Sequence, residues 1–243
     1  MTISKSIKTL SYLVITVFSL TSCTNDDDSI ASETLTEEEA VELVEASLQK
    51  NTGGLNETTK TYSEDLTTDI TLNEVCGILY EETFPYTYNG NFITANYIIV
   101  WSYQMSCNTL NIPETAEFNA TSSGVYTTRR IESNDVSQSS LSVSGLQPTS
   151  DTYLFNGNFK REGNQQITLN QNTRSVNSTV SLEITNLTVD KENYEIISGN
   201  GTVELTGSTN QGNSFSFEGS IIFNGNGSAT LTINGNGYEI NIN

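Results

Sequence analysis

An alternation of apolar and polar side chains with a period of two residues runs through most of this chain. It is clearest from Asn91 to Cys107, where the odd-numbered positions are mainly apolar or aromatic and most even-numbered positions are polar. Because successive side chains of a β-strand point to opposite faces, this pattern predicts a long strand with one buried face. Similar runs follow at spacings of roughly 8 to 12 residues, which is typical of antiparallel sheets.

Asn-Gly pairs lie between several of these runs, and this dipeptide is a strong signal for a tight hairpin turn. The pairs are Asn89-Gly90, Asn156-Gly157, Asn200-Gly201, Asn224-Gly225 and Asn234-Gly235. We expect each pair to mark a turn. The predicted fold class is therefore mainly β: an antiparallel meander over residues 73–243, forming a sandwich or a partly closed barrel.

A different period precedes the β region. Thr36 followed by Glu39 makes a capping box at a helix start, and Gly53-Gly54 supplies a stop. We predict one amphipathic helix over residues 35–54, packed on the sheet, and a linker or irregular strand over residues 55–72.

The first residues have the pattern of an export signal. Lys5 and Lys8 precede an apolar stretch, Leu10 to Leu20, which is short for a bilayer span. Leu20-Thr21-Ser22-Cys23 then matches the bacterial lipobox, in which the cysteine is acylated. We expect residues 1–22 to be removed as a lipoprotein signal peptide, and the lipid on Cys23 to hold the protein to a membrane. The alternatives are an ordinary secretory signal with a coincidental cysteine, or a buried helix.

An acidic tether, residues 23–34, follows this cysteine. Asp26, Asp27 and Asp28 resemble the export signal that carries lipoproteins of Bacteroidota to the outer face of the outer membrane. Asp28-Ser29-Ile30 resembles an O-glycosylation motif of that phylum, with Ser29 as the acceptor. The alternative for the acids is a solvated spacer on a protein that stays on the periplasmic face.

Residues 1 to 110 as a whole resemble uncharacterised lipoproteins of Bacteroidota. The resemblance rests on the lipobox, the acidic segment, the capped helix ending in Asn51-Thr52-Gly53-Gly54, and the cysteine-bearing β region after it. It implies an outer-membrane location, with the cell surface favoured, and it carries no known activity.

The charge of the chain excludes one class of partner. There are 29 acidic residues against 10 basic ones, a formal net charge of −19. Such a surface repels nucleic acids and anionic lipid head groups. We expect no nucleic-acid partner, and membrane contact only through the lipid on Cys23.

If Cys23 carries lipid, Cys76 and Cys107 remain as a pair, which predicts a disulfide in an oxidising compartment. Two free thiols or a redox pair are the alternatives, although a redox pair favours closer spacing. A two-residue hairpin at Asn89-Gly90 would place Cys76 opposite Tyr103, too far from Cys107. Either a bulge at Pro85 shifts the register, or the disulfide joins strands that are not paired.

Most enzyme chemistries lack their residues here. The chain has no histidine, which removes the Ser-His-Asp triad, the Cys-His dyad and imidazole metal sites. We find no phosphate-binding loop or dinucleotide motif, and predict no cofactor, no metal site and no catalytic residue. Carboxylate pairs could still hydrolyse glycosides. Glu81 and Glu82 would face opposite sides of a strand, whereas Asp190 and Glu192 fit a solvated turn or a weak calcium loop.

Two groups of side chains could contact a ligand. The basic pairs Arg129-Arg130 and Lys160-Arg161 could hold a carboxylate or sulfate, or pair with local acids. Tyr97, Trp101 and Tyr103 share one strand face, and could line a sugar or lipid pocket or belong to the core.

Three functions remain. The leading hypothesis is a non-enzymatic, lipid-anchored envelope protein with a binding, adhesion or accessory role. The second is a periplasmic carrier or chaperone whose helix covers a half-barrel holding a hydrophobic ligand, similar only in architecture to periplasmic lipoprotein carriers. A cavity lined by Tyr97, Ile99 and Trp101 would support it, and a filled core would exclude it. The third is a carboxylate-based hydrolase.

Overall fold

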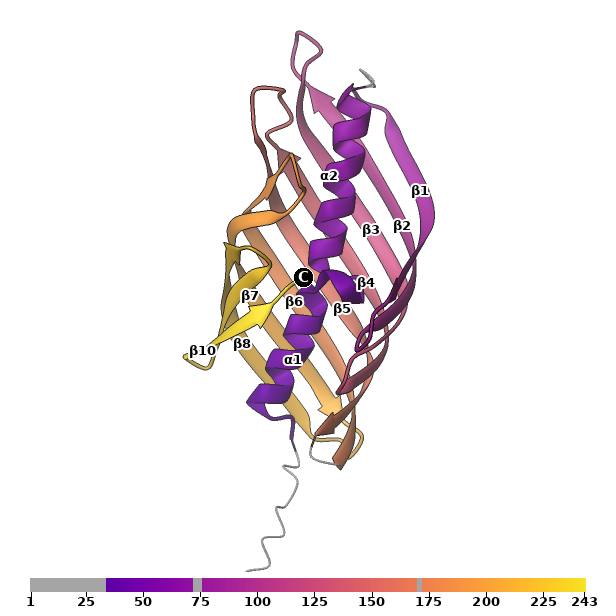
Figure 1. The fold of residues 1–243 in the computed structure, drawn as a ribbon, viewed down its shortest axis with the longest axis vertical. Helices are drawn as coiled ribbons and strands as arrows, with labels where there is room; N and C mark the ends of the chain where they lie inside the picture. Colours follow the sequence, from indigo (N-terminus) through magenta and orange to yellow (C-terminus); the bar gives the residue numbers. More distant parts are fainter. Residues whose placement is uncertain (1–33, 72–75, 170–171) are drawn as a thin grey trace, which may run out of the picture. The chain divides into compact units, whose positions relative to one another are not determined.

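The computed structural model describes residues 34–71, 76–169 and 172–243. Its strands form a single antiparallel sheet in which each strand pairs with the next one along the chain (Figure 1). The ten strands are β1 (Leu79–Asn89), β2 (Thr94–Cys107), β3 (Pro113–Thr127), β4 (Ile131–Ser144), β5 (Thr152–Leu169), β6 (Asn172–Asp190), β7 (Ile196–Thr209), β8 (Ser214–Gly225), β9 (Ser228–Ile233) and β10 (Asn236–Asn241). The predicted antiparallel meander is confirmed. All ten strands belong to one sheet, which is not closed into a barrel and has β1 and β10 as its edges.

Burial along the strands follows the predicted period. On β2, the side chains of Ala95, Tyr97, Trp101, Tyr103 and Met105 are at most 4% exposed, while the residues between them are exposed or half-buried. We call the side of the sheet that carries these buried residues the covered face, and the opposite side the open face.

Three helical segments lie across the covered face: α1 (Glu37–Leu48), the short 3-10 helix η1 (Lys50–Thr52) and α2 (Leu55–Thr71) (Figure 1). The predicted capping box is present. Thr36 Oγ1 accepts a hydrogen bond from the Glu39 N–H at 3.2 Å, and Glu39 Oε2 accepts one from the Thr36 N–H at 2.8 Å. The first helix ends before the glycines, and Gly53 follows η1 in the left-handed conformation.

The linker predicted over residues 55–72 is wrong, because residues 55–71 form α2. Leu55, Thr59, Tyr62 and Leu66 recur at helical spacing and are at most 2% exposed, so they form the face that packs on the sheet. The helix is rich in threonine, which has a low helix propensity, and packing on the sheet outweighs that preference. No helix in the described ranges is long and apolar enough to cross a bilayer.

The β1–β2 turn is longer than a two-residue hairpin, and this settles the register. Asn89 pairs with Thr94, and Pro85 pairs with Ile98 without a shift. Continuing that register brings Cys76 level with Cys107, and their Cα atoms lie 5.5 Å apart, as in a disulfide. Neither a bulge at Pro85 nor a bridge between unpaired strands is needed.

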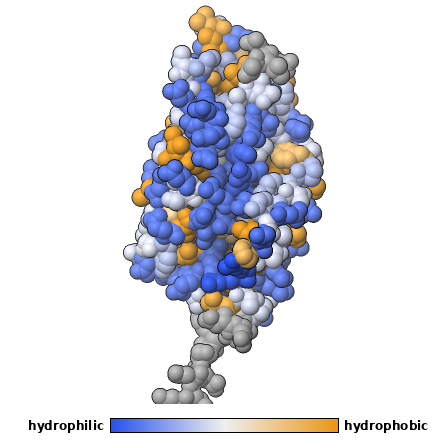
Figure 2. Space-filling model, in the orientation of Figure 1, coloured by the Kyte–Doolittle hydropathy of each residue, from blue (hydrophilic) through white to orange (hydrophobic). Residues whose placement is uncertain are grey.

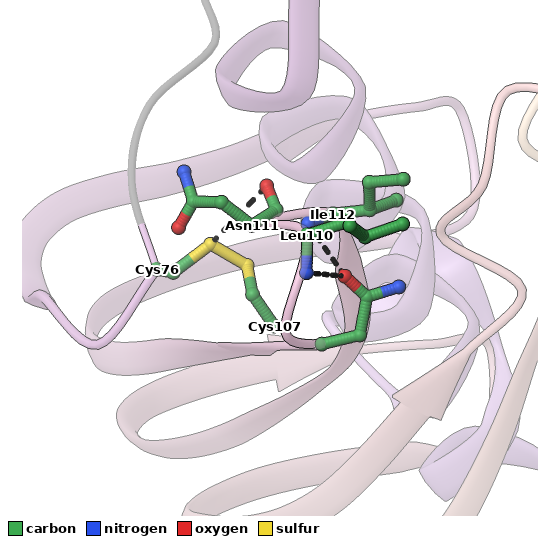
Figure 3. The surroundings of a disulfide bond; sticks show 6 residues. Cys76, Cys107, Leu110, Asn111 and Ile112 are labelled. Atoms are coloured by element: carbon green, nitrogen blue, oxygen red, sulfur yellow. Dashed lines mark hydrogen bonds between the residues drawn. A yellow bond between two sulfur atoms is a disulfide. The ribbon is translucent and has the colours of Figure 1, made fainter.

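The paired cysteines lie against the β2–β3 turn (Figure 3). Asn108 Oδ1 accepts hydrogen bonds from the Leu110 N–H at 2.9 Å and the Ile112 N–H at 3.0 Å, and Cys76 Sγ lies 3.9 Å from the Asn111 carbonyl oxygen. The asparagine side chain and the cysteine pair therefore hold this end of the sheet in a defined shape.

Three of the five predicted Asn-Gly turns are wrong. Asn234-Gly235 forms the β9–β10 turn and Asn89-Gly90 begins the β1–β2 turn, but Asn156-Gly157 and Asn200-Gly201 lie inside β5 and β7. Asn224-Gly225 ends β8, and the next two residues, 226 and 227, make the β8–β9 turn. A Cβ atom on Gly157 would lie 2.1 Å from the Ser140 carbonyl oxygen. The glycine is needed because neighbouring backbones approach closely there, as they do where a sheet bends.

The end of the chain is fixed to the break between the helices. The Ile242 carbonyl oxygen accepts hydrogen bonds from the Lys50 N–H at 3.0 Å and from Asn56 Nδ2 at 2.7 Å. From the other edge of the sheet, the Tyr86 hydroxyl donates to the Lys50 carbonyl oxygen at 2.7 Å. The helix break therefore connects β1 and the segment after β10, although these two edges do not pair with each other.

Candidate functional site

The aromatic residues considered as a ligand face lie in the core. Tyr97, Trp101 and Tyr103 are 1%, 4% and 2% exposed. Tyr62 of α2 stacks on Trp101 with ring centroids 5.6 Å apart, and on Phe118 of β3 at 4.2 Å. These rings fill the space beneath α2, so they offer no open ligand face in this arrangement.

Arg161 is a buried side chain that connects the sheet to the helical segments. It lies on β5, is 2% exposed, and its Nε is 3.3 Å from Asp135 Oδ1 on β4. Its Nη atoms donate to the carbonyl oxygens of Ala46 at 2.8 Å, and of Thr52 and Gly53 at 2.9 Å. These carbonyls belong to the end of α1 and the break after it, where backbone acceptors lack helical partners. Arg161 therefore has a structural role.

Asp135 is held from its other sides by hydroxyl groups. The Tyr97 hydroxyl donates to both carboxylate oxygens, at 3.0 and 3.1 Å, and Ser133 Oγ donates to Oδ2 at 2.6 Å. A buried charge is tolerated only with such partners, so this network fixes α1 and η1 over the middle of the sheet.

Three of the four bases that the sequence singles out pair with acids, and one does not. Arg161 pairs with Asp135, Lys160 with Glu162, and Arg130 with Glu42 of α1. The guanidinium carbon of Arg129 instead lies 3.6 Å from the centroid of the Phe92 ring. Within the described residues, no acid pairs with Arg129.

Arg129 and Phe92 stand in the wall of an open pocket of about 640 Å³, which we call the turn pocket. The pocket lies between α1, the β1–β2 turn, the β3–β4 turn and the end of β10. Its lining residues are Glu42, Glu45, Ala46, Gln49, Phe92, Ile93, Thr128, Arg129, Arg130, Ile131 and Asn241. Its volume is within the range of sites for small organic ligands.

Local hydrogen bonds shape the two turns that form the pocket wall. In the β1–β2 turn, the Gly90 N–H donates to the Ile93 carbonyl oxygen at 2.8 Å, and Phe92 is left 59% exposed. In the β3–β4 turn, Thr128 Oγ1 accepts from the N–H groups of Arg130 at 3.2 Å and Ile131 at 3.0 Å. The turn thus holds Arg129 at its tip, exposed and beside Phe92.

The carboxyl groups in the pocket already have partners. Glu42 pairs with Arg130, and Glu45 Oε1 accepts from the Asn241 N–H at 3.1 Å and from Gln49 Nε2 at 3.2 Å. Burial, with a smaller contribution from Glu42, raises the pKa of Glu45. Among the residues described, Arg129 is therefore the charged group in the wall whose side chain has neither an ion pair nor a hydrogen bond.

A second hollow, of about 580 Å³, lies over strands β3 to β6. Asn134, Asn164 and Asn177 form one cross-strand row in its wall. On one face of any sheet, neighbouring rows of side chains are separated by two residues along each strand. The space between two such rows is a shallow trough, so its presence here does not by itself indicate a binding site. We therefore give this hollow less weight than the turn pocket.

The side that carries the helices is mainly hydrophilic, with apolar residues in separate small patches (Figure 2).

The acidic pairs are separated or occupied. Glu81 pairs with Ser102 and Glu82 with Trp101, so the two carboxyls leave the backbone on opposite faces of β1. Asp190 Oδ1 accepts from the N–H groups of Glu192 and Asn193 at 2.8 and 3.1 Å, which closes a turn. In the ranges that the structure describes, no three Cys, Asp or Glu side chains are grouped to hold a metal ion.

No family model, curated protein or solved structure matches this chain. Cys23, Asp26, Asp27, Asp28 and Ser29 lie outside the described residues, so lipidation, export and glycosylation stay predictions.

Sequence reasoning singled out Arg129 but missed Phe92. A signal was present, because Phe92 is an aromatic residue at an even position of a segment whose core residues occupy odd positions. An aromatic residue out of phase beside a turn indicates exposure, and exposed aromatic side chains are common at binding surfaces.

Replacing Asp65 of α2 is expected to change the pH dependence of stability. Partial burial raises the pKa of Asp65 from 3.8 to about 7, and the charges of Glu82, Asp69 and Glu64 add to this shift. Between pH 3.8 and about pH 7, Asp65 is therefore protonated more often in the folded state than in the unfolded chain. The contribution of this proton to the free energy of unfolding is fully present below pH 3.8 and is lost as pH rises through about 7. We expect Asp65→Asn to raise the unfolding free energy by about 1 kcal/mol at pH 8, allowing for solvent screening, with little change near pH 4. Urea unfolding at pH 4, 6 and 8 measures this, and an equal effect at all three values would contradict it.

Proposed function

We propose that this protein is a non-enzymatic, lipid-anchored envelope protein that captures a ligand in the turn pocket. The observation that carries the proposal is the wall of that pocket, where Arg129 has no acidic partner among the described residues and its guanidinium lies over the exposed ring of Phe92. An unpaired guanidinium beside an exposed aromatic ring resembles the composition of interface anchors.

The anchoring half of the proposal rests on the sequence. The lipobox ending at Cys23 supplies a lipid attachment point, and the acidic residues 26–28 resemble a signal for export to the cell surface. The acidic charge of the chain disfavours a flat approach to anionic lipid, because like charges repel. A tether that carries the domain away from the bilayer is consistent with that charge.

The binding half follows from how the polar groups of the pocket are used. Its carboxyl groups are engaged by Arg130, Gln49 and the Asn241 backbone, so they fix the wall and do not form an opposed acid pair. The two short turns and α1 that form the wall are joined by the Arg130–Glu42 pair and the Arg129–Phe92 contact. Contacts that exist before the ligand arrives lower the entropic cost of binding. Capture of a ligand is therefore the role we assign to the pocket.

A ligand screen with a blocked variant tests this proposal. The purified protein is heated with a panel of small organic acids, neutral saccharides, acidic saccharides and short peptides. A ligand present at 100 times its Kd should stabilise the fold by about 2.7 kcal/mol, a shift of several degrees in Tm. Asn241→Trp should abolish the shift, because the indole would fill the pocket mouth while the backbone N–H bond to Glu45 remains.

The matched control is Asn158→Trp, which adds the same ring at an exposed position of β5 that does not line the turn pocket. The control should respond to ligand as the wild type does. Either no shift with any member of the panel, or an equal shift in the Asn241→Trp variant, would refute capture in the turn pocket.

A second candidate, the carrier of a hydrophobic ligand, is favoured by one observation beneath α2. Trp101 Nε1 and the Tyr103 hydroxyl are buried without a hydrogen-bond partner in the described structure. The rings of α2 and the sheet fill this space, so the carrier role holds only if α2 moves aside and lets a ligand oxygen reach these two groups. Mass spectrometry of lipids extracted from the purified protein tests this, and the carrier role requires a stoichiometric lipid.

A further inference from the structure

The charged residues of the turn pocket determine which sign of charge a ligand should carry. The Arg130–Glu42 pair cancels, and the Glu45 carboxyl has two hydrogen-bond donors of its own. Arg129 is left as the group that gains most from a partner. A guanidinium is a planar fork of N–H donors that matches carboxylate and sulfate oxygens, so an oxyanion is the complement.

The position of Arg129 over Phe92 prepares it for such a partner. The guanidinium carbon of Arg129 lies over the Phe92 ring, 3.6 Å from its centroid. The contact lowers the freedom of a long side chain before any ligand arrives, and the ring adds a cation–π attraction. The donor fork is thus partly fixed in place at the pocket wall.

Phe92 supplies a second contact. Arg129 stands over one face of the ring, and the side chain is still 59% exposed. An apolar ring face packed on that exposed surface would remove apolar area from water. The ligand should therefore carry an apolar face close to its oxyanion.

The remaining polar wall argues for a ligand with hydroxyl groups. Gln49, Asn241 and Thr128 line the pocket beside Glu45. A fatty acyl chain would bury Gln49 Oε1 and Asn241 Nδ2, which have no hydrogen-bond partner among the described residues, and burying such polar atoms is costly. A densely charged polyanion would meet Glu45 and the acidic surface of the chain. A sugar ring with one oxyanion meets neither objection, because its hydroxyl groups can donate to and accept from the wall.

We propose that the turn pocket binds an acidic saccharide, with its carboxylate or sulfate on Arg129 and an apolar face of the ring on Phe92. The inference rests on the proposed function, which it deepens by naming the class of ligand. Carboxylate and sulfate share the chemistry that Arg129 recognises, and the experiment below separates them.

Calorimetric titration with three trisaccharides tests the inference: a galactose trimer with one residue replaced by galacturonic acid, the same trimer with one sulfate group, and the neutral galactose trimer. The wild type should bind at least one acidic sugar roughly 10-fold or more tighter than the neutral one, as expected for a charge-assisted hydrogen bond. Arg129→Gln should weaken acidic binding by roughly 10-fold to 100-fold and leave neutral binding unchanged. Phe92→Ala should weaken binding of all the sugars that bind.

Lys160→Gln is the matched control, because it removes an exposed base from β5 that already pairs with Glu162. It should bind as the wild type does, whereas a loss equal to that of Arg129→Gln would indicate non-specific attraction and overturn the inference. Equal binding of neutral and acidic sugars with no effect of Arg129→Gln would also overturn it.

The two proposals fail in different ways. If no saccharide binds but a peptide or organic acid from the screen is blocked by Asn241→Trp, the saccharide class is wrong and capture in the pocket stands. If saccharides bind and Asn241→Trp has no effect, the pocket is the wrong site and both proposals fail. Tighter binding of the uronate or of the sulfated sugar identifies which oxyanion Arg129 accepts.

Discussion

Asp135→Ala is expected to lower the free energy of unfolding by about 3–5 kcal/mol, the range seen when one partner of a buried ion pair is removed. Arg161 would keep three backbone carbonyls as acceptors, but its charge would have no counter-charge at 2% exposure. The change also strands the Tyr97 hydroxyl, which donates to Asp135 in the wild type.

Urea unfolding of the two single variants and the double variant Asp135→Ala/Arg161→Met measures the coupling. The double variant should lose less than the sum of Asp135→Ala and Arg161→Met, because it buries no unpaired charge. Lys160→Gln, next to Arg161 but exposed, should change stability by less than about 0.5 kcal/mol. A loss below about 1 kcal/mol for Asp135→Ala would show that the pair does not hold the helices on the sheet.

Removing the cysteine pair is expected to have the second largest effect. Cys76 and Cys107 are 31 residues apart in sequence, and a cross-link of that span restricts the unfolded chain by about 3–4 kcal/mol in the loop-entropy model. The double variant Cys76→Ser/Cys107→Ser should therefore lose about 3 kcal/mol, or roughly 6–12 °C in Tm for a domain of this size.

Thermal unfolding with and without a reducing agent supplies the control. Reductant should lower the Tm of the wild type to that of the double variant, and should not affect the double variant. If the wild type melts at the same temperature in both conditions, the two cysteines are free thiols, which was the alternative open from the sequence.

The sheet could be predicted from the sequence, whereas its register could not. Side-chain alternation reports which face of a strand is buried, and β2 follows it from Ala95 to Met105. Register depends on turn length, and Asn89-Gly90 suggested a two-residue turn where the chain uses four residues, 90–93. That difference moves Cys76 from opposite Tyr103 to level with Cys107.

The second helix, α2, could not be predicted from the sequence because it also depends on contacts between distant parts of the chain. The face of α2 that packs on the sheet mixes Leu55 and Leu66 with Thr59 and Tyr62, and its tyrosine hydroxyl lies 3.0 Å from Ser139 Oγ. Composition alone resembles a linker, because the contacts that stabilise the helix come from strands far along the chain. The Asn-Gly pairs inside β5 and β7 predict turns from local sequence alone. The sequence does not show that neighbouring backbones approach closely at these glycines, because that approach exists only in the folded sheet.

The candidate site was predicted only in part. Arg129 and Arg130 stood out as bases in an acidic chain, but their different roles depend on Glu42, which lies 88 residues from Arg130. The wall of the turn pocket also joins Glu45 to Asn241, 196 residues apart. Such contacts have no local signature, so a single sequence shows the candidate residues without showing which of them share a pocket.

Protease accessibility on intact cells tests whether the binding domain is displayed at the cell surface on a lipid-anchored tether. Cells carrying the wild type or a variant with Asp26, Asp27 and Asp28 changed to alanine are treated with protease, and the domain is followed with an antibody against the purified protein. We expect the wild type to be cleaved and released from the cells, and the alanine variant to be protected. Protection of both would contradict surface display, and would place the domain and its turn pocket on the periplasmic side.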